Sequence, residues 1–360
     1  MEMRKKILCI ADAPGPVEFL APVIPLFVRT HEVAVVGVQT AMHVLASNGA
    51  IECNDEMLVE DVYEKICPDL LISAISSLTH GPYVNNKFIE IAYRHHIPVI
   101  SLQDYWGNHR APHNRNIIKY LTGVCVPDDF AASLWREDEY KGDIMVTGNP
   151  GFDHFAAMDV EKERRRIRDQ LHFKLEDRVI LFAGQGTPKH IESDKITFAF
   201  VAEAIRMLAA AMPVKLIIRP HPRAIETAYY GEYARGIDVV DTSFSEFSDN
   251  VLPAADVVVS MGSTNLVHAC YLRIPGVSVL LPEQGMMIFK NIGLDDFPPN
   301  ILGATVGVYE ENPEILQRVL QKIFSDGSFV AEMRAAQEKN FVRDAGSAQR
   351  VFDAIRNCIV

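Results

Sequence analysis

Short apolar runs recur along this chain, and within each run the apolar residues are nearly continuous. A strand with one face in water alternates apolar and polar residues, whereas a continuous apolar run is typical of a strand buried on both faces. Longer segments with helical periodicity separate the runs, which predicts parallel sheets with helices on both faces. The predicted strands are residues 7–11, 32–38, 69–73, 98–102, 123–126, 143–147, 178–183, 214–219, 238–241, 256–260 and 277–281.

The length of the chain and a pause in this alternation indicate two domains. The chain has 360 residues, and a domain commonly has about 100–200 residues. The alternation pauses over residues 148–160 and then begins again. We therefore predict an α/β protein with two facing, doubly wound, Rossmann-like domains, residues 1–150 and 151–335, and a C-terminal helix at 336–360. The predicted helices are residues 17–28, 58–66, 87–95, 158–170, 194–211, 245–251, 265–272 and 313–324, with a mainly helical stretch over 330–359.

Charge and hydropathy exclude several classes of protein. The net charge is −12, from 35 basic and 47 acidic residues, so the chain as a whole is not a basic nucleic-acid binder. No apolar run reaches the ~18 residues of a membrane span, and the run at 7–10 is too short for a signal peptide. We therefore expect a cytoplasmic protein without a transmembrane segment, for which peripheral contact with a membrane stays open.

The sequence lacks the familiar motifs for metal and nucleophilic chemistry. The six cysteines form no CxxC pair and are interpreted as buried, reduced thiols. We find no HExxH, no convincing DxD, no GxGxxG, no P-loop and no GxSxG pattern. We therefore expect no metal site and no required cofactor.

Residues 219–223, which read RPHPR, follow a buried predicted strand. Ligands of open α/β sheets bind outside the carboxyl ends of the strands, so this loop is a candidate binding site. Arg219 and Arg223 suit a phosphate or carboxylate, and His221 can donate a proton or a hydrogen bond. The alternative is a rigid turn, shaped by the two prolines, in which the histidine is only structural.

Two further loops follow predicted strands of the second domain. Residues 260–265, SMGSTN, lead from a strand into a helix, so Gly262, Ser263 and Thr264 can bind an anion or simply cap the helix. Gly184 and Gly186, in the sequence AGQG, let a ligand approach the backbone closely. We assign these five residues to binding of the substrate.

Acidic residues follow predicted strands of the first domain. Asp12, in the turn ADAPGP at 11–16, is a candidate general base or a helix cap, and Gly15 of the same turn is assigned to substrate binding. Asp104, in the segment QDYWGNHR at 103–110, is a second candidate base, beside aromatic residues that can stack on a sugar. Residues 76–81 can carry another titrating group. Each of these loops can instead merely connect two elements.

The order of the motifs resembles that of two-domain nucleotide-sugar enzymes with the GT-B fold. Residues 144–153, IMVTGNPGFD, are similar to the V-T-G-N-P-x-x-D segment at the hinge of UDP-N-acetylglucosamine 2-epimerases and related transferases. Residues 219–223 resemble the K/R-P-H-P-R segment of capsule-polysaccharide and teichoic-acid transferases. Residues 260–275 resemble the S-x-S-S/T-x-x-x-E-A-x-x-x-G-x-P segment that holds the nucleotide of the donor in such enzymes.

This resemblance implies roles for single residues. Arg219 and His221 would contact the donor phosphates, and Ser263 and Thr264 would bind them from the helix start. Where many relatives have a ribose-binding glutamate, this chain has His268, which we assign to nucleotide binding. The place of the epimerase motif H-x-E-A-G-x-R reads QDYWGNHR, which weakens the epimerase interpretation. The resemblance also implies a last helix that crosses back onto the first domain.

Taken with the loops described above, this resemblance implies a metal-independent glycosyltransferase of surface-glycan biosynthesis. It would move a sugar, or a similar polyol unit, from a nucleotide-activated donor to the hydroxyl of a glycan or lipid-linked acceptor. Arg219 and His221 would stabilise the leaving diphosphate, and Asp12 or Asp104 would take the proton of the acceptor. Two alternatives stay open, namely an enzyme like the UDP-N-acetylglucosamine 2-epimerases and a nucleotide-binding module without turnover.

Overall fold

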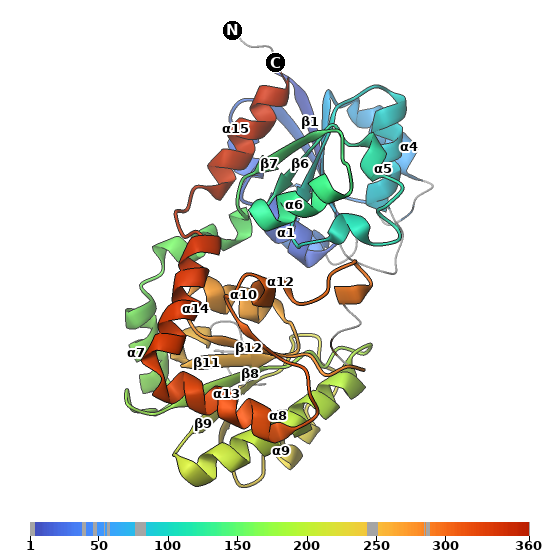
Figure 1. The fold of residues 1–360 in the computed structure, drawn as a ribbon. Coiled ribbons are helices and arrows are strands. Elements are labelled where there is room, and N and C mark those ends of the chain that lie inside the picture. The colour runs from blue at the N-terminus through green and yellow to red at the C-terminus, as the bar shows by residue number, and fades with distance from the viewer. Residues whose placement is uncertain are drawn as a thin grey trace. The chain divides into compact units, whose positions relative to one another are not determined.

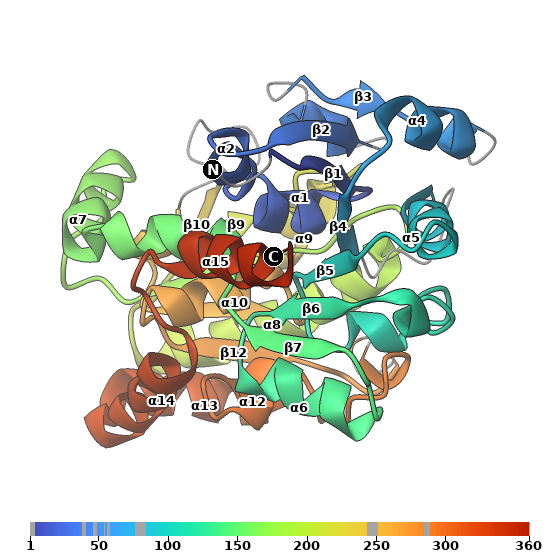
Figure 2. The ribbon, with the colours of Figure 1, turned by 90° about the horizontal axis from the view of Figure 1, so that it is seen from above.

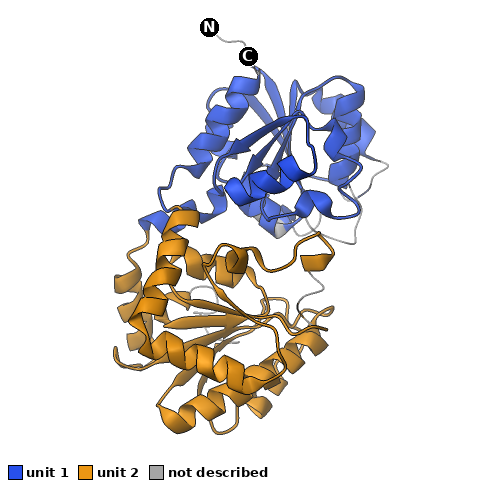
Figure 3. Cartoon of the chain, viewed as in Figure 1, with its two compact units in different colours: residues 1–157, 343–360 blue, residues 158–342 orange. Residues whose placement is uncertain are grey.

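The computed structural model describes residues 4–37, 41–45, 49–53, 55, 58–75, 84–242, 251–283, 285 and 289–359. The chain divides into two compact units (Figures 1 and 3). Unit 1 consists of Met1–Ala157 and Arg343–Val360, and unit 2 consists of Met158–Val342. Each unit has its own parallel sheet with helices on both faces, as the continuous apolar strands predict.

The sheet of unit 1 has seven strands in the order β3-β2-β1-β4-β5-β6-β7, which Figure 2 shows in succession. All paired strands are parallel. The elements of unit 1 are β1 Lys6–Ala11, α1 Pro14–Leu20, α2 Ile24–Val28, β2 Glu32–Gly37, α3 Met42–Leu45, β3 Ile51–Glu52, α4 Val59–Ile66, β4 Leu70–Ile75, α5 Val84–Arg94, β5 Val99–Gln103, the 3-10 helices η4 Asn108–Arg110 and η5 Ile118–Tyr120, β6 Gly123–Val126, α6 Asp129–Glu137, β7 Asp143–Val146, η6 Pro150–Ala157 and α15 Ser347–Ile359.

The central strands of unit 1 are buried and the edge strands are not. Every residue of β4, β5 and β6 is buried, whereas β3 and the two ends of β7 are exposed. The helix α15 packs against this core, where Phe352 lies 4.9 Å from Phe27 of α2 between ring centroids. The last helix of the chain thus belongs to the unit formed by the first residues.

The segment 144–153, which resembles the V-T-G-N-P motif, makes hydrogen bonds to the first residues of α15. The carboxylate of Asp153 accepts the backbone N–H groups of Ser347 and Ala348 over 3.2 and 2.9 Å, and so caps the start of the helix. Arg350 of α15 donates from Nε to the carbonyl of Thr147 over 2.8 Å. Gly148 has a φ of +82°, and a Cβ there would collide with the hydroxyl of Ser347. Glycine is therefore required at position 148 both by the backbone and by the approach of the helix.

The sheet of unit 2 has six parallel strands in the order β10-β9-β8-β11-β12-β13. Its elements are α7 Val160–Gln170, β8 Val179–Ala183, α8 Ile191–Ala211, β9 Lys215–Arg219, α9 Ala228–Tyr233, β10 Asp238–Asp241, η7 Leu252–Ala254, β11 Val257–Ser260, α10 Thr264–Tyr271, β12 Gly276–Val279, α12 Pro298–Ile301, β13 Val306–Val308, α13 Pro313–Ser325 and α14 Gly327–Asn340. In both units the strand order reverses once, between β1 and β4 in unit 1 and between β8 and β11 in unit 2.

Some predicted elements differ from the observed ones. The single helix predicted at 17–28 is wrong, because the chain forms α1 and then α2, which begins afresh at Ile24 with Pro25 in its first turn. The helices α6 and α9 and the short strands β3 and β13 were not predicted. The helix predicted at 245–251 lies, apart from Val251, outside the described residues. Among the described residues, no helix combines the length and hydrophobicity needed to cross a membrane.

Candidate functional site

The strand register of unit 2 aligns three loops at one edge of its sheet. Ala183 ends β8 and pairs with Arg219 at the end of β9 and with Ser260 at the end of β11. Ligands of open α/β sheets bind at the carboxyl edge where the strand order reverses, which here is between β8 and β11. The loops that follow these three strands therefore begin side by side at the position expected of a binding site.

The loop after β9 presents basic side chains in a defined arrangement. The backbone N–H of Arg223 donates to Nδ1 of His221 over 3.0 Å. Because Nδ1 accepts, the neutral ring carries its proton on Nε2 and can donate from there. Arg219 and His221 are partly buried, and Arg223 is exposed. The loop thus offers two guanidinium groups and an imidazole N–H, which are donors suited to a phosphate.

The surroundings of His221 keep its ring neutral at pH 7. Burial first, and then the nearby Arg223, Arg219 and His190, together lower the pKa of His221 to about 4. Like charges that disfavour a proton on His221 favour the arrival of an anion. The electrostatics of the loop therefore agree with an anion-binding role.

The loop after β11 turns sharply into α10. Gly262 has a φ of +89°, and a Cβ there would lie 2.9 Å from Cζ of Phe289, so the turn requires glycine. Ser263 is the N-cap of α10, and its hydroxyl accepts the backbone N–H of Asn265 over 3.2 Å. Thr264, in the first turn, is exposed. Ser263 therefore has a capping role in any case, while Thr264 is accessible at the helix start.

The glycines of the loop after β8 accommodate side chains of the protein itself. A Cβ on Gly184 would collide with the hydroxyl of Tyr230, and one on Gly186 would lie 2.8 Å from the hydroxyl of Tyr229. Both hydroxyls donate to Oδ2 of Asp194, which is fully buried near the start of α8. Oδ1 of Asp194 accepts the N–H of residue 185 over 2.5 Å. Asp194 therefore holds the loop in place.

Asp194 and its tyrosine partners were not among the predicted site residues. An acidic residue at the start of an otherwise apolar helix pattern was the available signal, since a buried carboxylate needs hydrogen-bond partners. The remaining candidate in unit 2, His268, lies on α10 one turn after Thr264 and is partly buried.

In unit 1, candidate acidic residues come together at the ends of β1 and β5, the two strands that flank β4. Asp12 follows β1 and Asp104 follows β5. Oδ2 of Asp104 lies so close to Gly15 of α1 that a Cβ at position 15 would overlap it. Glu18 lies one turn further along α1 and was not predicted as a site residue. We call Asp12, Glu18 and Asp104 the acidic group. The segment 76–81, which follows β4, lies outside the described residues.

The environment of Asp104 raises the proton affinity of its carboxyl group. Burial raises the pKa of Asp104 to about 7, the charges of Asp12 and Glu18 raise it as well, and a hydrogen bond from Asn108 acts in the opposite direction. Burial also raises the pKa of Glu18, while nearby His154 lowers it. A carboxyl group with a pKa near 7 can take up or release a proton at neutral pH, as general acid–base chemistry requires.

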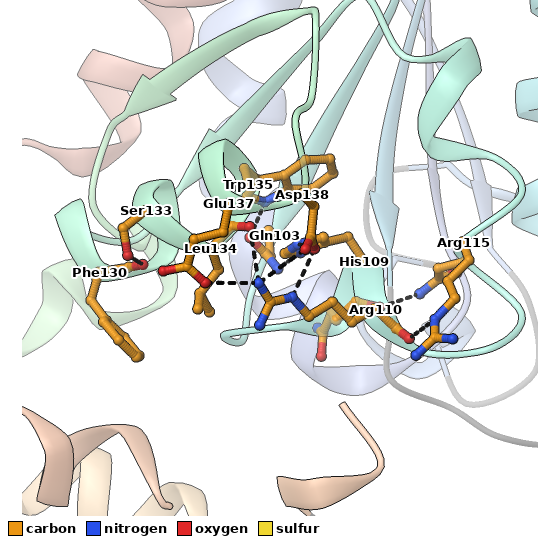
Figure 4. Close-up of polar contacts among 12 residues, drawn as sticks. Gln103, His109, Arg110, Arg115, Phe130, Ser133, Leu134, Trp135, Glu137 and Asp138 are labelled. Carbon is orange, nitrogen blue, oxygen red and sulfur yellow. Dashed lines mark hydrogen bonds and ion pairs between the residues drawn. The ribbon is translucent and has the colours of Figure 1, made fainter. Parts of the chain in front are cut away.

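The basic residues of the segment 103–110 are engaged in contacts within unit 1 (Figure 4). The ring of His109 stacks on Trp135 at 4.0 Å, with Nδ1 3.1 Å from Nε2 of Gln103 and Nε2 2.9 Å from the carboxylate of Asp138. Arg110 donates to both oxygens of Asp138, over 2.7 and 3.1 Å. Burial lowers the pKa of His109 to about 4 in spite of Asp138. These side chains stabilise the segment and do not project as anion ligands.

Comparison with known proteins identifies the fold of this chain. No protein-family model matches the sequence, and no curated protein matches it. Among solved structures, S. aureus MnaA with UDP is 16% identical, with a TM-score of 0.69 over 99% of this chain and 97% of that one. The UDP-GlcNAc 2-epimerase of Neisseria meningitidis, bound to UDP-GlcNAc, is 13% identical, with a TM-score of 0.65 over 98% and 99%. A glycosyltransferase from Rickettsia africae is 13% identical, with a TM-score of 0.61 over 99% and 98%. The chain therefore has the GT-B fold, with two Rossmann-like domains, that these nucleotide-sugar enzymes share.

Proposed function

We propose that this protein is a glycosyltransferase that uses a nucleotide-activated sugar, or a similar activated polyol unit, as its donor. The observation that carries the proposal is the register of unit 2, which sets the basic loop after β9 and the start of α10 on either side of the loop after β8. Both flanking features suit a diphosphate. The fold likeness to structures that contain UDP or UDP-GlcNAc supports the same ligand class.

In this proposal unit 2 binds the donor. Arg219 and Arg223 offset the negative charge that the diphosphate gains as the glycosidic bond breaks, and His221 donates a hydrogen bond from Nε2. Thr264 donates from the accessible start of α10. His268, further along the helix, contacts the nucleoside. Hydrogen-bond donors that are held in place before the reaction need little reorganisation when charge develops on the diphosphate, and this accounts for their catalytic effect.

Unit 1 supplies the general base. Asp104 takes the proton of the acceptor hydroxyl as the acceptor oxygen bonds to the anomeric carbon and the bond to the diphosphate breaks. Its pKa of about 7 leaves a substantial fraction ionised at neutral pH; burial is the main cause of this raised pKa, and the charges of Asp12 and Glu18 add to it. Because Gly15 has no Cβ, Oδ2 of Asp104 can lie close to α1. The acceptor is a glycan or a lipid-linked sugar of a surface polysaccharide.

Epimerisation of a UDP-N-acetylhexosamine is the second candidate function. The UDP-GlcNAc 2-epimerase structures among the fold neighbours favour it. The acidic group also favours it, because neighbouring carboxyl groups can move a proton within one substrate without an acceptor. The two reactions differ in one measurable respect, since only transfer requires a second substrate.

A thermal-shift screen followed by turnover assays tests the proposal. UDP, CDP, GDP, CMP and their sugars are screened, and a ligand present at ~100 times its Kd should stabilise the protein by ~2.7 kcal/mol. Release of the nucleotide from the best donor is then measured with and without an oligosaccharide acceptor. Transfer predicts release that depends on the acceptor, is lost in Asp104→Asn and is retained in the control Glu64→Gln, an exposed residue of α4.

The other outcomes are equally specific. A new sugar epimer formed without acceptor would establish the second candidate, and ligand binding without any turnover would indicate a nucleotide-binding module. If no nucleotide or nucleotide-sugar stabilises the protein, then transfer, epimerisation and nucleotide binding without turnover are all wrong.

A further inference from the structure

Among the described residues, the buried side chain of Asn108 makes one hydrogen bond, to Asp104. Its Nδ2 donates to Oδ1 of Asp104 over 2.5 Å, and the side chain is fully buried. Its own carboxamide oxygen has no hydrogen-bond partner among the described residues. A buried polar atom without a partner costs free energy, so this arrangement needs an explanation. Turning the amide over would place its oxygen against the carboxylate and replace attraction with repulsion.

The backbone of Asn108 is fixed by its surroundings. Gly107, just before it, adopts a left-handed conformation with a φ of +72° and precedes the 3-10 helix η4. The carbonyl of Asn108 accepts the side-chain amide of Asn114 over 2.8 Å and the N–H of Ala111 over 3.2 Å. These bonds hold the amide of Asn108 in one place, four residues beyond the carboxylate that it contacts.

The residues that follow Asn108 anchor it to α6. His109 and Arg110 both bond to Asp138, the C-cap residue that follows α6, as Figure 4 shows. His109 also stacks on Trp135 of α6 and bonds to Gln103 at the end of β5. We call His109, Arg110 and Asp138 the clamp. The clamp ties the segment that bears Asp104 and Asn108 to a second element of unit 1.

We propose that Asn108 is a positioning residue, which holds one oxygen of Asp104 so that the other oxygen is presented for proton transfer, and that the clamp holds Asn108 in turn. Oδ1 is the oxygen that accepts from Asn108, and Oδ2 is the oxygen beside Gly15. The two oxygens thus have different neighbours, and Oδ2 is the reactive one. This inference rests on the proposed role of Asp104 as the base.

Several charged and titratable groups near Asp104 influence its pKa together with Asn108. Among the described residues these are Asp12 after β1, Glu18 on α1 and the adjoining Tyr105, with His154 of η6 next to Glu18. Burial and the two acidic residues favour the protonated form of Asp104. The N–H of Asn108 favours the ionised form, because a donor stabilises a negative charge. Loss of this donor should therefore raise the pKa of Asp104.

Titration of aspartate carboxyl carbons by NMR tests this directly and does not require turnover. The protein is labelled at aspartate Cγ, and the signal of Asp104 is assigned by its loss in Asp104→Asn. In Asn108→Ala we expect the pKa of Asp104 to rise by ~1 unit, the size typical of one lost hydrogen bond to a carboxylate. The matched control is Asn86→Ala, because Asn86 of α5 also donates its amide to an oxygen, the carbonyl of His113, over 2.8 Å. It should leave the pKa of Asp104 unchanged.

A second variant covers the case in which the alanine variant does not fold. Asn108→Asp keeps the shape of the side chain and replaces the donor with a carboxyl group, so the pKa of Asp104 should rise further than in the alanine variant. In turnover assays kcat should fall, its acidic limb should move to higher pH, and the affinity for the donor should not change. Asp138→Asn, which weakens the clamp, should produce the same changes to a smaller extent.

The outcomes separate this inference from the proposed function. An unchanged pKa of Asp104 in both Asn108 variants would overturn the positioning role, whatever the activity. A raised pKa together with full turnover in Asp104→Asn would support the positioning contact and refute the proposed role of Asp104 as base.

Discussion

Replacing Asp104 by asparagine should stabilise unit 1 at neutral pH while it abolishes turnover. The carboxyl group has an ordinary pKa of 3.8 in the unfolded chain and about 7 in the folded protein. Between these values the folded protein keeps a proton that the unfolded chain has lost. The stability of the wild type therefore falls as the pH rises from about 4 to about 7, and it levels off above that range. The amide cannot ionise, so the variant escapes this loss.

The size of the effect follows from the difference between the two pKa values. About three pKa units at about 1.36 kcal/mol each set an upper bound of about 4 kcal/mol for the gain at pH 8. Asp104 is partly exposed, and solvent screening reduces the expected gain to about 1–3 kcal/mol. Asparagine keeps an oxygen that can accept from Asn108, so the substitution removes the charge without removing that hydrogen bond.

Tryptophan fluorescence measures the stability of unit 1, the unit that contains Asp104. The chain has two tryptophans, Trp106 and Trp135, and both lie in unit 1. Urea unfolding is followed at pH 5, 6, 7 and 8 for the wild type, Asp104→Asn and the exposed control Glu64→Gln. The stability advantage of Asp104→Asn should grow with pH up to about 7, and that of Glu64→Gln should stay near zero. An advantage that is absent at pH 8, or that shrinks as the pH rises, would refute the assigned environment of Asp104.

Three further predictions follow from the same geometry. Gly15→Ala places a Cβ against Oδ2 of Asp104, so the carboxylate must shift. A displacement of ~1 Å should lower kcat by ~100-fold with donor affinity nearly unchanged. Full activity would contradict the assignment of Oδ2. The turnover of the wild type should fall as the pH drops through about 7, because Asp104 must be ionised to act as a base, and a flat profile from pH 5 to 8 would exclude it. Gly148→Ala should destabilise unit 1 by more than the ~1–2 kcal/mol of a left-handed alanine, because the new Cβ also meets Ser347. The control Gly49→Ala also has a positive φ but has nothing within 4 Å of the new Cβ, so it should show the backbone cost alone. Equal losses of stability in urea would disprove the contact with α15.

The strands were predictable because both faces of each sheet are covered. A buried strand such as β4, whose six residues are all buried, must be apolar throughout, and this leaves a run that is visible in the sequence. The edge strands β3 and β13 were missed because they have two and three residues and are partly exposed. The break between α1 and α2 was missed because the apolar pattern continues across it.

The site was predictable as a set of loops but not as a set of contacts. Because parallel strands end at one edge, Asp12 and Asp104 could be identified before their proximity was known. The sequence could not reveal that Glu18 joins them or that the glycines of the β8 loop face Tyr229 and Tyr230, since these contacts depend on how helices pack on the sheet. For the same reason the clamp around Asp138 could not be foreseen.

The affinity of a nucleoside diphosphate for Arg219→Ala tests the central claim most directly. Isothermal titration is carried out with the diphosphate that stabilises the wild type best, on the wild type, Arg219→Ala and the control Arg165→Ala, an exposed residue of α7. A charge-assisted hydrogen bond contributes ~1.5–3 kcal/mol, so Arg219→Ala should bind ~10–100-fold more weakly. The control should bind like the wild type. Equal affinity in Arg219→Ala and the wild type would contradict the claim that the edge of the unit 2 sheet holds the diphosphate.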